Sequence, residues 1–258
     1  MVIAIILNFI ILFVTARLFV KLGWTVVNYK GDKVPYNIGL CVFISLFLLL
    51  ALKQSISLIA LIYLATLWLT GFIDDRFGTK YPKGLKGHIS LFISKGKMST
   101  GLLKLVGTII ISFIFATFIG DRAILEKIII FLILIMTPHV MNLFDTRPLR
   151  VWKVIFIHSF IFLPTLIRLS VSTQVSVLLI LSSFLYYEGN KRGMLGDNGA
   201  TLLGGGIGLG LIYHLSFFLQ CILVLAYFSI ILITERISLT EWIESNPILS
   251  RIDRWGVS

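Results

Sequence analysis

The chain has 258 residues, of which 57% are apolar and only 14% charged, and it carries a formal net charge of +11. Soluble domains average roughly 45–50% apolar and about 25% charged residues, so this composition argues against a water-soluble enzyme or scaffold. A transmembrane helix needs about 20 mostly apolar residues. We therefore expect the function to reside in membrane helices and the loops that join them.

Apolar runs, taken in chain order, predict an all-α polytopic membrane protein with about nine transmembrane helices. The predicted ranges are 2–22, 36–52, 55–73, 101–120, 124–141, 151–169, 171–187, 199–213 and 216–234. After the last range, apolar and charged residues mix around Pro247, which predicts a C-terminal interfacial helix broken at that proline. We expect one multi-span membrane domain, 1–234, and a cytosolic amphipathic tail, 235–258.

The basic residues predict which side of the membrane each loop faces, because Lys and Arg accumulate on the cytoplasmic side. With the N-terminus outside, nearly all of the 23 basic residues lie inside or within a span, and the exceptions are Lys53, Arg122, Lys127 and Arg168. The positive charge is thus interpreted as topology. Nucleic acid is not an expected partner.

Four acids fall at the predicted inner ends of spans, where a carboxylate usually faces a polar cavity or a partner. Asp74 and Asp75 end the third range, just before Arg76. Because a helix C-terminus disfavours acids, a cation should compensate them. Either Arg76 and Lys80 pair with them as interfacial charges, or the acids hold a metal ion or a metal-bound phosphate.

The other two acids lie in motifs that suit a hard cation. Asn142 and Asp145 are three residues apart and would share a helical face; the alternative is a helix end that dissolves into the following turn. Asp197, in Gly196-Asp197-Asn198-Gly199-Ala200, is either an ordinary N-cap or part of a site where backbone N–H groups approach an anion. The glycines from 204 to 210 are expected to permit close helix packing.

Two basic loops accompany these acids. The loop that joins the first two predicted spans contains Lys30 and Lys33, and the segment from Lys80 to Lys97 follows the paired acids. These lysines are interpreted either as phosphate-binding residues or as positive-inside charges.

Taken together and in order, four segments resemble the polyprenyl-phosphate N-acetylhexosamine-1-phosphate transferases, the superfamily of phospho-N-acetylmuramoyl-pentapeptide transferase. The segments are Asp74-Asp75, Lys83-Gly84-Leu85-Lys86-Gly87, Asn142-Leu143-Phe144-Asp145 and Gly196 to Ala200. The resemblance covers roughly residues 28 to 210, and the ordered set is more specific than any one motif.

The resemblance implies a transferase of cell wall biogenesis in the bacterial inner or plasma membrane, with its active site facing the cytoplasm. Such an enzyme moves a sugar 1-phosphate from a UDP-sugar to a polyprenyl phosphate with Mg²⁺, which gives a lipid-linked pyrophosphate sugar and UMP. The expected partners are these two substrates and the bilayer, with a homodimer as an option.

The same resemblance implies roles for individual residues. Asp197 and Asn142 would bind Mg²⁺, Asp74 and Asp75 would position or deprotonate the lipid phosphate, and Asp145 would organise metal or nucleotide. Substrate-binding roles fall on Lys30, Lys33, Lys80, Lys86, Asn198 and Gly199. Direct attack by the lipid phosphate needs no enzyme nucleophile, and a covalent step through an aspartate stays open.

The chain departs from the family pattern in three places. Gly78 stands where the family commonly has a lysine, Thr146-Arg147-Pro148 replaces a segment with glycine and a further acid, and the His/Arg-rich loop before a tenth span is missing. The sugar is therefore not specified. Two other classes stay open: a catalytically silent membrane partner or scaffold, which the departures favour, and an ion-coupled transporter, which would want acids near mid-span.

Overall fold

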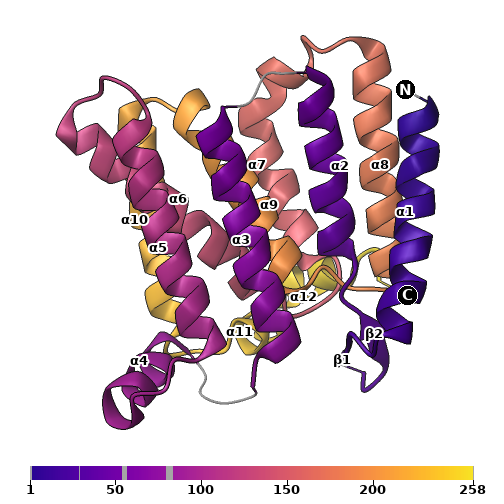
Figure 1. Cartoon of the computed structure of the whole chain (residues 1–258), viewed down its shortest axis with the longest axis horizontal. Helices are drawn as coiled ribbons and strands as arrows, with labels where there is room; N and C mark the ends of the chain where they lie inside the picture. Colours follow the sequence, from indigo (N-terminus) through magenta and orange to yellow (C-terminus); the bar gives the residue numbers. More distant parts are fainter. Residues whose placement is uncertain (1, 29, 54–56, 80–83, 258) are drawn as a thin grey trace.

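The computed structural model describes residues 2–28, 30–53, 57–79 and 84–257 and is predominantly helical (Figure 1). Its elements are α1 (Val2–Lys21), β1 (Thr25–Val27), β2 (Lys33–Pro35), α2 (Ile38–Lys53), α3 (Leu58–Phe77), α4 (Gly84–Lys95), α5 (Thr100–Phe118), α6 (Ile124–Phe144), α7 (Arg150–Leu166), α8 (Val171–Gly189), α9 (Gly196–His214), α10 (Phe217–Thr234), α11 (Leu239–Ser245) and α12 (Pro247–Arg254). The predicted all-α class is confirmed.

Each of the nine predicted ranges coincides with a helix whose ends differ from the prediction by a few residues. Within the described residues, 5 helices are long and apolar enough to cross a membrane, namely α3, α5, α6, α8 and α10. Their outward faces expose large apolar side chains such as Phe113 and Phe218. These features are compatible with a membrane protein.

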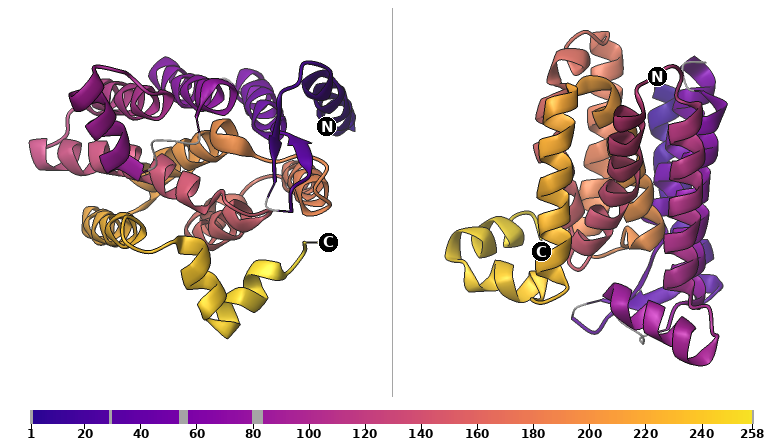
Figure 2. Two further views of the ribbon diagram at one scale, coloured as in Figure 1. Left: turned by 90° about the horizontal axis from the view of Figure 1, so that it is seen from below. Right: turned by 90° about the vertical axis from the view of Figure 1, so that its left-hand side faces the viewer.

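Helix α9 lies at the centre of the bundle. It packs against α2, α3, α6 and α7, with α1 to α3 on one side and α7 and α8 on the other (Figure 2). A Cβ atom at Gly205 would lie 2.3 Å from Leu67 Cδ1, and one at Gly204 would lie 2.6 Å from Pro138 Cα. The prediction that these glycines permit close packing is thus confirmed, but it was wrong for Gly206, where a Cβ would meet nothing within 4 Å.

Several small elements gather at one end of the bundle, at the bottom of Figure 1. Strands β1 and β2 form an antiparallel hairpin with Val26 opposite Val34. This hairpin was not predicted, because strands of three residues are too short to give a recognisable sequence pattern. Helix α4 lies in the segment expected to be a basic loop. The tail forms two helices, and Pro247 opens the second, so the predicted break is confirmed.

The tail folds back onto the bundle through one buried ion pair. Arg150, the first residue of α7, donates from Nε and Nη2 to the two carboxylate oxygens of Asp253 on α12, both at 2.8 Å. Lys153 Nζ donates to the Asp253 carbonyl oxygen at 2.6 Å. The tail is therefore anchored at the same end of the bundle as the hairpin.

Candidate active site

Helix α3 carries the paired acids in its last turn. Ser57 caps its start by accepting a hydrogen bond from the Ala60 backbone N–H at 3.4 Å. At the other end, the Gly78 N–H donates to the Asp74 carbonyl oxygen at 2.7 Å, and a Cβ at position 78 would lie 2.3 Å from that oxygen. The turn that ends α3 therefore suits glycine at position 78.

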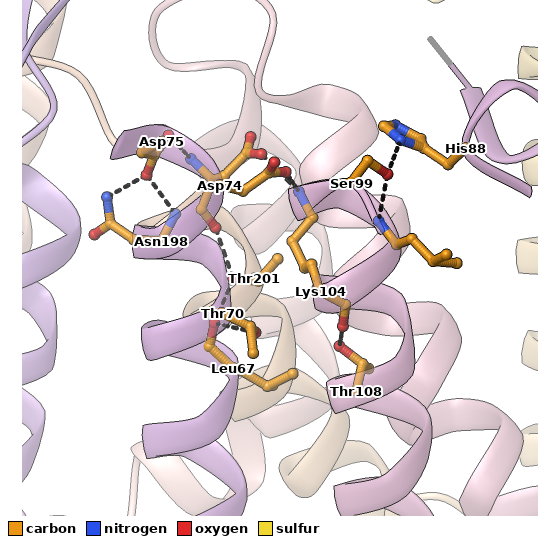
Figure 3. A network of polar contacts seen from close by, with 12 residues as sticks. Leu67, Thr70, Asp74, Asp75, His88, Ser99, Lys104, Thr108, Asn198 and Thr201 are labelled. Carbon is orange, nitrogen blue, oxygen red and sulfur yellow. Dashed lines mark hydrogen bonds and ion pairs between the residues drawn. The ribbon is translucent and has the colours of Figure 1, made fainter. Parts of the chain in front are cut away.

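Asp75 caps the beginning of α9, which lies 122 residues further along the chain. Its Oδ1 accepts from the Asp197 backbone N–H at 3.0 Å, and its Oδ2 accepts from the Asn198 N–H at 2.9 Å and from Asn198 Nδ2 at 2.6 Å (Figure 3). The first N–H groups of a helix carry partial positive charge and need acceptors. Asp75 thus receives its compensation from backbone and amide donors.

This arrangement changes the interpretation of Asp197. It lies in the first turn of α9, and the residue at the N-cap position is Leu195, which makes no side-chain cap hydrogen bond. The N-cap interpretation of Asp197 was therefore wrong, because the capping carboxylate comes from Asp75 across the bundle. The Asp197 side chain is therefore not needed as a cap and can make other contacts.

Lys104 is the residue toward which the Asp197 side chain points. Its Nζ lies 2.7 Å from Asp74 Oδ2 and 2.6 Å from Asp197 Oδ2, so one ammonium from α5 bridges α3 and α9 (Figure 3). Lys104 was predicted only as a positive-inside charge. The signal that could have identified it is a lone lysine inside the apolar range 101–120.

Asn142, near the end of α6, joins the same group. In the amide orientation that satisfies its neighbours, its nitrogen donates to Asp197 Oδ1 at 2.9 Å and its oxygen accepts from Lys104 Nζ at 3.3 Å. The structure therefore brings together Asp74, Asn142 and Asp197, three residues selected from sequence, around a fourth that was missed.

The donor set fits Mg²⁺ by its chemistry. Oxygens of two carboxylates and one amide surround a single cationic atom, and Mg²⁺ is commonly held by one or two carboxylates together with waters and substrate phosphates. In the part of the chain that the structure describes, no group of three or more His, Cys, Asp or Glu side chains could hold a metal ion. Two carboxylates and one amide would supply only part of the octahedral shell of Mg²⁺.

Asp145 lies apart from the face expected for it. Helix α6 ends at Phe144, so Asp145 is the C-cap residue rather than a member of the last helical turn shared with Asn142. It lines a cavity of about 220 Å³ with Arg147, Glu188 and Lys191. Burial raises the pKa of the Asp145 carboxyl well above its usual range, and the negative charges of Glu188 and Asp197 act in the same direction.

Glu188, on the wall of this cavity, was not selected from the sequence. Its carboxylate accepts hydrogen bonds from the Trp152 indole N–H and from the Leu195 backbone N–H, the latter at 3.3 Å. It therefore fixes the loop that leads into α9. An acid at the inner end of the range 171–187 was the available signal.

The predicted substrate-binding residues are spread over several elements. Lys33 is exposed on β2, and Lys30 lies in the hairpin turn beside Lys191. Lys86 lies in α4, and Lys80 lies outside the described residues. None of these positions tests a substrate-binding role, so those roles stay predictions.

Asn198 and Gly199 are buried in the first turn of α9. Besides Asp75, Asn198 contacts the Tyr36 carbonyl oxygen, to which Nδ2 donates at 3.3 Å. A Cβ at Gly199 would lie 2.9 Å from the Cα of Gly39. Both residues hold α9 against its neighbours in this structure, and their substrate-binding roles stay predictions.

No family model matches the chain, and neither curated proteins nor solved structures show a significant similarity to it. The fold and site geometry described above therefore carry the functional argument together with the resemblance of the ordered motifs.

Proposed function

We propose that this protein is a phosphosugar transferase that moves a sugar 1-phosphate from a UDP-sugar to a polyprenyl phosphate at the cytoplasmic face of a cell membrane. The observation that carries the proposal is the convergence of Asp74, Asp197 and Asn142 on one cationic atom at the end of the bundle. These residues come from α3, α9 and α6, and three of the four ordered motifs supply them.

The proposed reaction is direct. An oxygen of the polyprenyl phosphate attacks the β-phosphorus of the UDP-sugar, and the bond from that phosphorus to the bridging oxygen breaks. UMP leaves with the electron pair, and the sugar remains on the new lipid pyrophosphate. Catalysis of such a transfer consists chiefly of positioning the substrates and neutralising the phosphate oxygens. Acids that hold a metal ion, together with nearby lysines, can do both.

The residues divide this task by position. Asp197, Asn142 and Asp74 would hold Mg²⁺, which supplies the charge that neutralises the phosphates. Asp75 keeps the first turn of α9 in place through three hydrogen bonds. The hairpin of β1 and β2, which carries Lys30 and Lys33, lies at the same end of the bundle (Figure 1), and Lys191 lies beside Lys30. These lysines would attract the anionic donor.

The proposal also includes the membrane arrangement. The nine helices that coincide with the predicted ranges would all span the bilayer, including α1, α2, α7 and the glycine-rich α9, with the hairpin, α4 and the tail in the cytoplasm. Asp74, Asp145 and Asp197 lie at helix ends rather than at mid-length, which favours a site at the membrane surface over a transporter's mid-membrane site.

Purified protein with Mg²⁺, polyprenyl phosphate and a panel of UDP-sugars tests the proposal through release of UMP. We expect UMP with one or a few donors, and only when the lipid phosphate is present. Omission of lipid and omission of Mg²⁺ are the matched controls. If a cooperative thermal unfolding transition shows that the protein is folded and no donor gives UMP, the result would count against the transferase.

A catalytically silent membrane partner is the second candidate, and one observation favours it. Lys104 already pairs with Asp74 and Asp197 within the chain, so both acids have a cationic partner without any metal. The UMP measurement separates the two candidates, because a silent partner releases no UMP with any donor.

A further inference from the structure

Lys104 stands in the position that a bound cation would take. Its Nζ contacts one oxygen of Asp74 and one of Asp197, both at less than the usual N–H···O distance of about 2.9 Å. The side chains of Lys104 and Asp74 are each 15% exposed and that of Asp197 is 32% exposed. The contact is thus partly shielded from water. A charge that is shielded in this way needs a close partner of opposite sign.

The ammonium and a divalent cation compete for the same oxygens. Asp74 Oδ2, Asp197 Oδ2 and the amide oxygen of Asn142 all face Nζ, so a metal ion bound to these oxygens would coincide with the ammonium or lie against it. Two like charges at such a distance repel strongly in a partly buried site. Both cations are therefore not bound to this oxygen set at once.

We propose that Lys104 is an internal counter-cation that competes with a divalent cation for the oxygens of Asp74, Asp197 and Asn142, and that a divalent cation binds by displacing its ammonium from Asp74 and Asp197. The proposal rests on the cation-binding part of the proposed function. It does not depend on which sugar or lipid is used.

The arrangement of the chain permits such a displacement. Lys104 lies in the second turn of α5, and four methylene groups separate its Nζ from the backbone, so the ammonium can move without movement of the helix. A phosphate-bearing substrate would offer new acceptors for it. The lysine thus weakens binding of a divalent cation and couples that binding to the arrival of an anion.

Mn²⁺ binding to purified full-length protein, measured by electron paramagnetic resonance, tests the competition without any substrate. In Lys104→Met the competitor is absent, and we expect the dissociation constant to fall by about 5- to 150-fold, the usual range of coupling between two ligands. Lys127→Met is the matched control, because among the described residues Lys127 Nζ makes one hydrogen bond, to the Thr117 carbonyl oxygen at 3.3 Å, and no ion pair with an acid. That variant should bind Mn²⁺ as the unchanged chain does.

A second measurement needs no variant and so survives failure of Lys104→Met to fold. Acylation of lysines in the unchanged protein, followed by mass spectrometry, should modify Lys104 faster when Mg²⁺ is added and leave the rate at Lys127 the same. Unchanged or weaker Mn²⁺ binding in folded Lys104→Met, or a Lys104 rate that Mg²⁺ does not raise, overturns the proposal.

The two proposals fail separately. Tighter Mn²⁺ binding in Lys104→Met without UMP formation would keep the internal counter-cation and remove the transferase. UMP formation by the unchanged chain, with no change of Mn²⁺ binding in Lys104→Met, would keep the transferase and remove the internal counter-cation.

Discussion

Two charged clusters lie at the same end of the helix bundle, and they are balanced differently. On α7 and α12, Arg150 meets Asp253 through two hydrogen bonds, and their side chains are 3% and 8% exposed. On α3, α5 and α9, the single ammonium of Lys104 faces two carboxylates. The first cluster pairs one cation with one carboxyl group, whereas the second sets one cation against two carboxyl groups.

Two carboxyl groups outside the spans, Asp253 and Asp145, have pKa values shifted in opposite directions. Burial alone would raise the pKa of the Asp253 carboxyl, but the hydrogen bonds and charge of Arg150 outweigh burial and hold that pKa below its usual range. Burial raises the pKa of Asp145, which belongs to neither cluster, and the neighbouring acids, Asp197 of the second cluster among them, add to the effect. A balanced cluster serves to fasten the tail, and a cluster rich in acids is suited to recruiting a cation.

The largest effect on stability is expected from Asp253→Ala, which breaks the balanced cluster. Removing one partner of a buried ion pair leaves the other uncompensated, so we expect a loss of about 3–5 kcal/mol in the free energy of unfolding. Mn²⁺ binding should not change. Glu244→Ala is the matched control, because the Arg147–Glu244 pair is more exposed, and such a pair contributes about 1 kcal/mol or less. Equal losses in both variants would contradict a special role for the buried Arg150–Asp253 pair in holding the tail.

Asp197→Asn tests the acid-rich cluster. It removes one of the two charges that face Lys104 while keeping the size of the side chain, and we expect UMP release to fall by about 10²–10³-fold. The thermal unfolding temperature should change little. Asp121→Asn makes the same chemical change at an exposed position near the opposite end of the bundle and should leave the rate unchanged. A variant at position 197 that retains full activity would remove Asp197 from the site.

Gly71→Ala sharpens the comparison by moving the backbone of the acid-rich cluster. A Cβ at Gly71 would lie 2.7 Å from both the Asp197 carbonyl oxygen and the Asn198 Cα, so α3 and α9 must separate. We expect a loss of about 1–3 kcal/mol in stability. Gly206→Ala, with nothing within 4 Å of the added Cβ, should be neutral or slightly stabilising. Chemical unfolding of both variants decides the point.

The smallest effect is expected from Asp145→Asn and depends on pH. Because the pKa of Asp145 is raised on folding, its ionisation costs stability as pH rises above the usual carboxyl range of about 4. The variant should therefore unfold at a higher temperature than the unchanged chain at neutral pH, and the difference should vanish toward about pH 4. A difference that grows as pH falls would contradict this sign.

The sequence predicted the helices well, because each apolar run reads directly as a helix. It also selected Asp74, Asn142 and Asp197, which the structure brings together. What it could not predict are contacts between distant segments. Asp75 and the N-terminus of α9 are 122 residues apart, and no local pattern announces that one caps the other.

Lys104 was missed for a related reason. A lysine near the start of a span satisfies the positive-inside pattern by itself, so nothing in the sequence demands a partner for it. Its two carboxylates come from α3 and α9, and only the packing of α5 against α3 places them within reach. The hairpin and α4 escaped prediction because their segments are shorter than a span and lie among the lysines that were interpreted as basic loops.

The central claim, transfer of a sugar together with its phosphate, is tested most directly by a UDP-sugar labelled in its β-phosphate. With polyprenyl phosphate and Mg²⁺, we expect the label to pass into the lipid fraction while unlabelled UMP appears in equal amount, and Asp197→Asn should suppress both. Label that stays in the aqueous phase as UDP, or no turnover with any donor in the panel, would contradict the transferase.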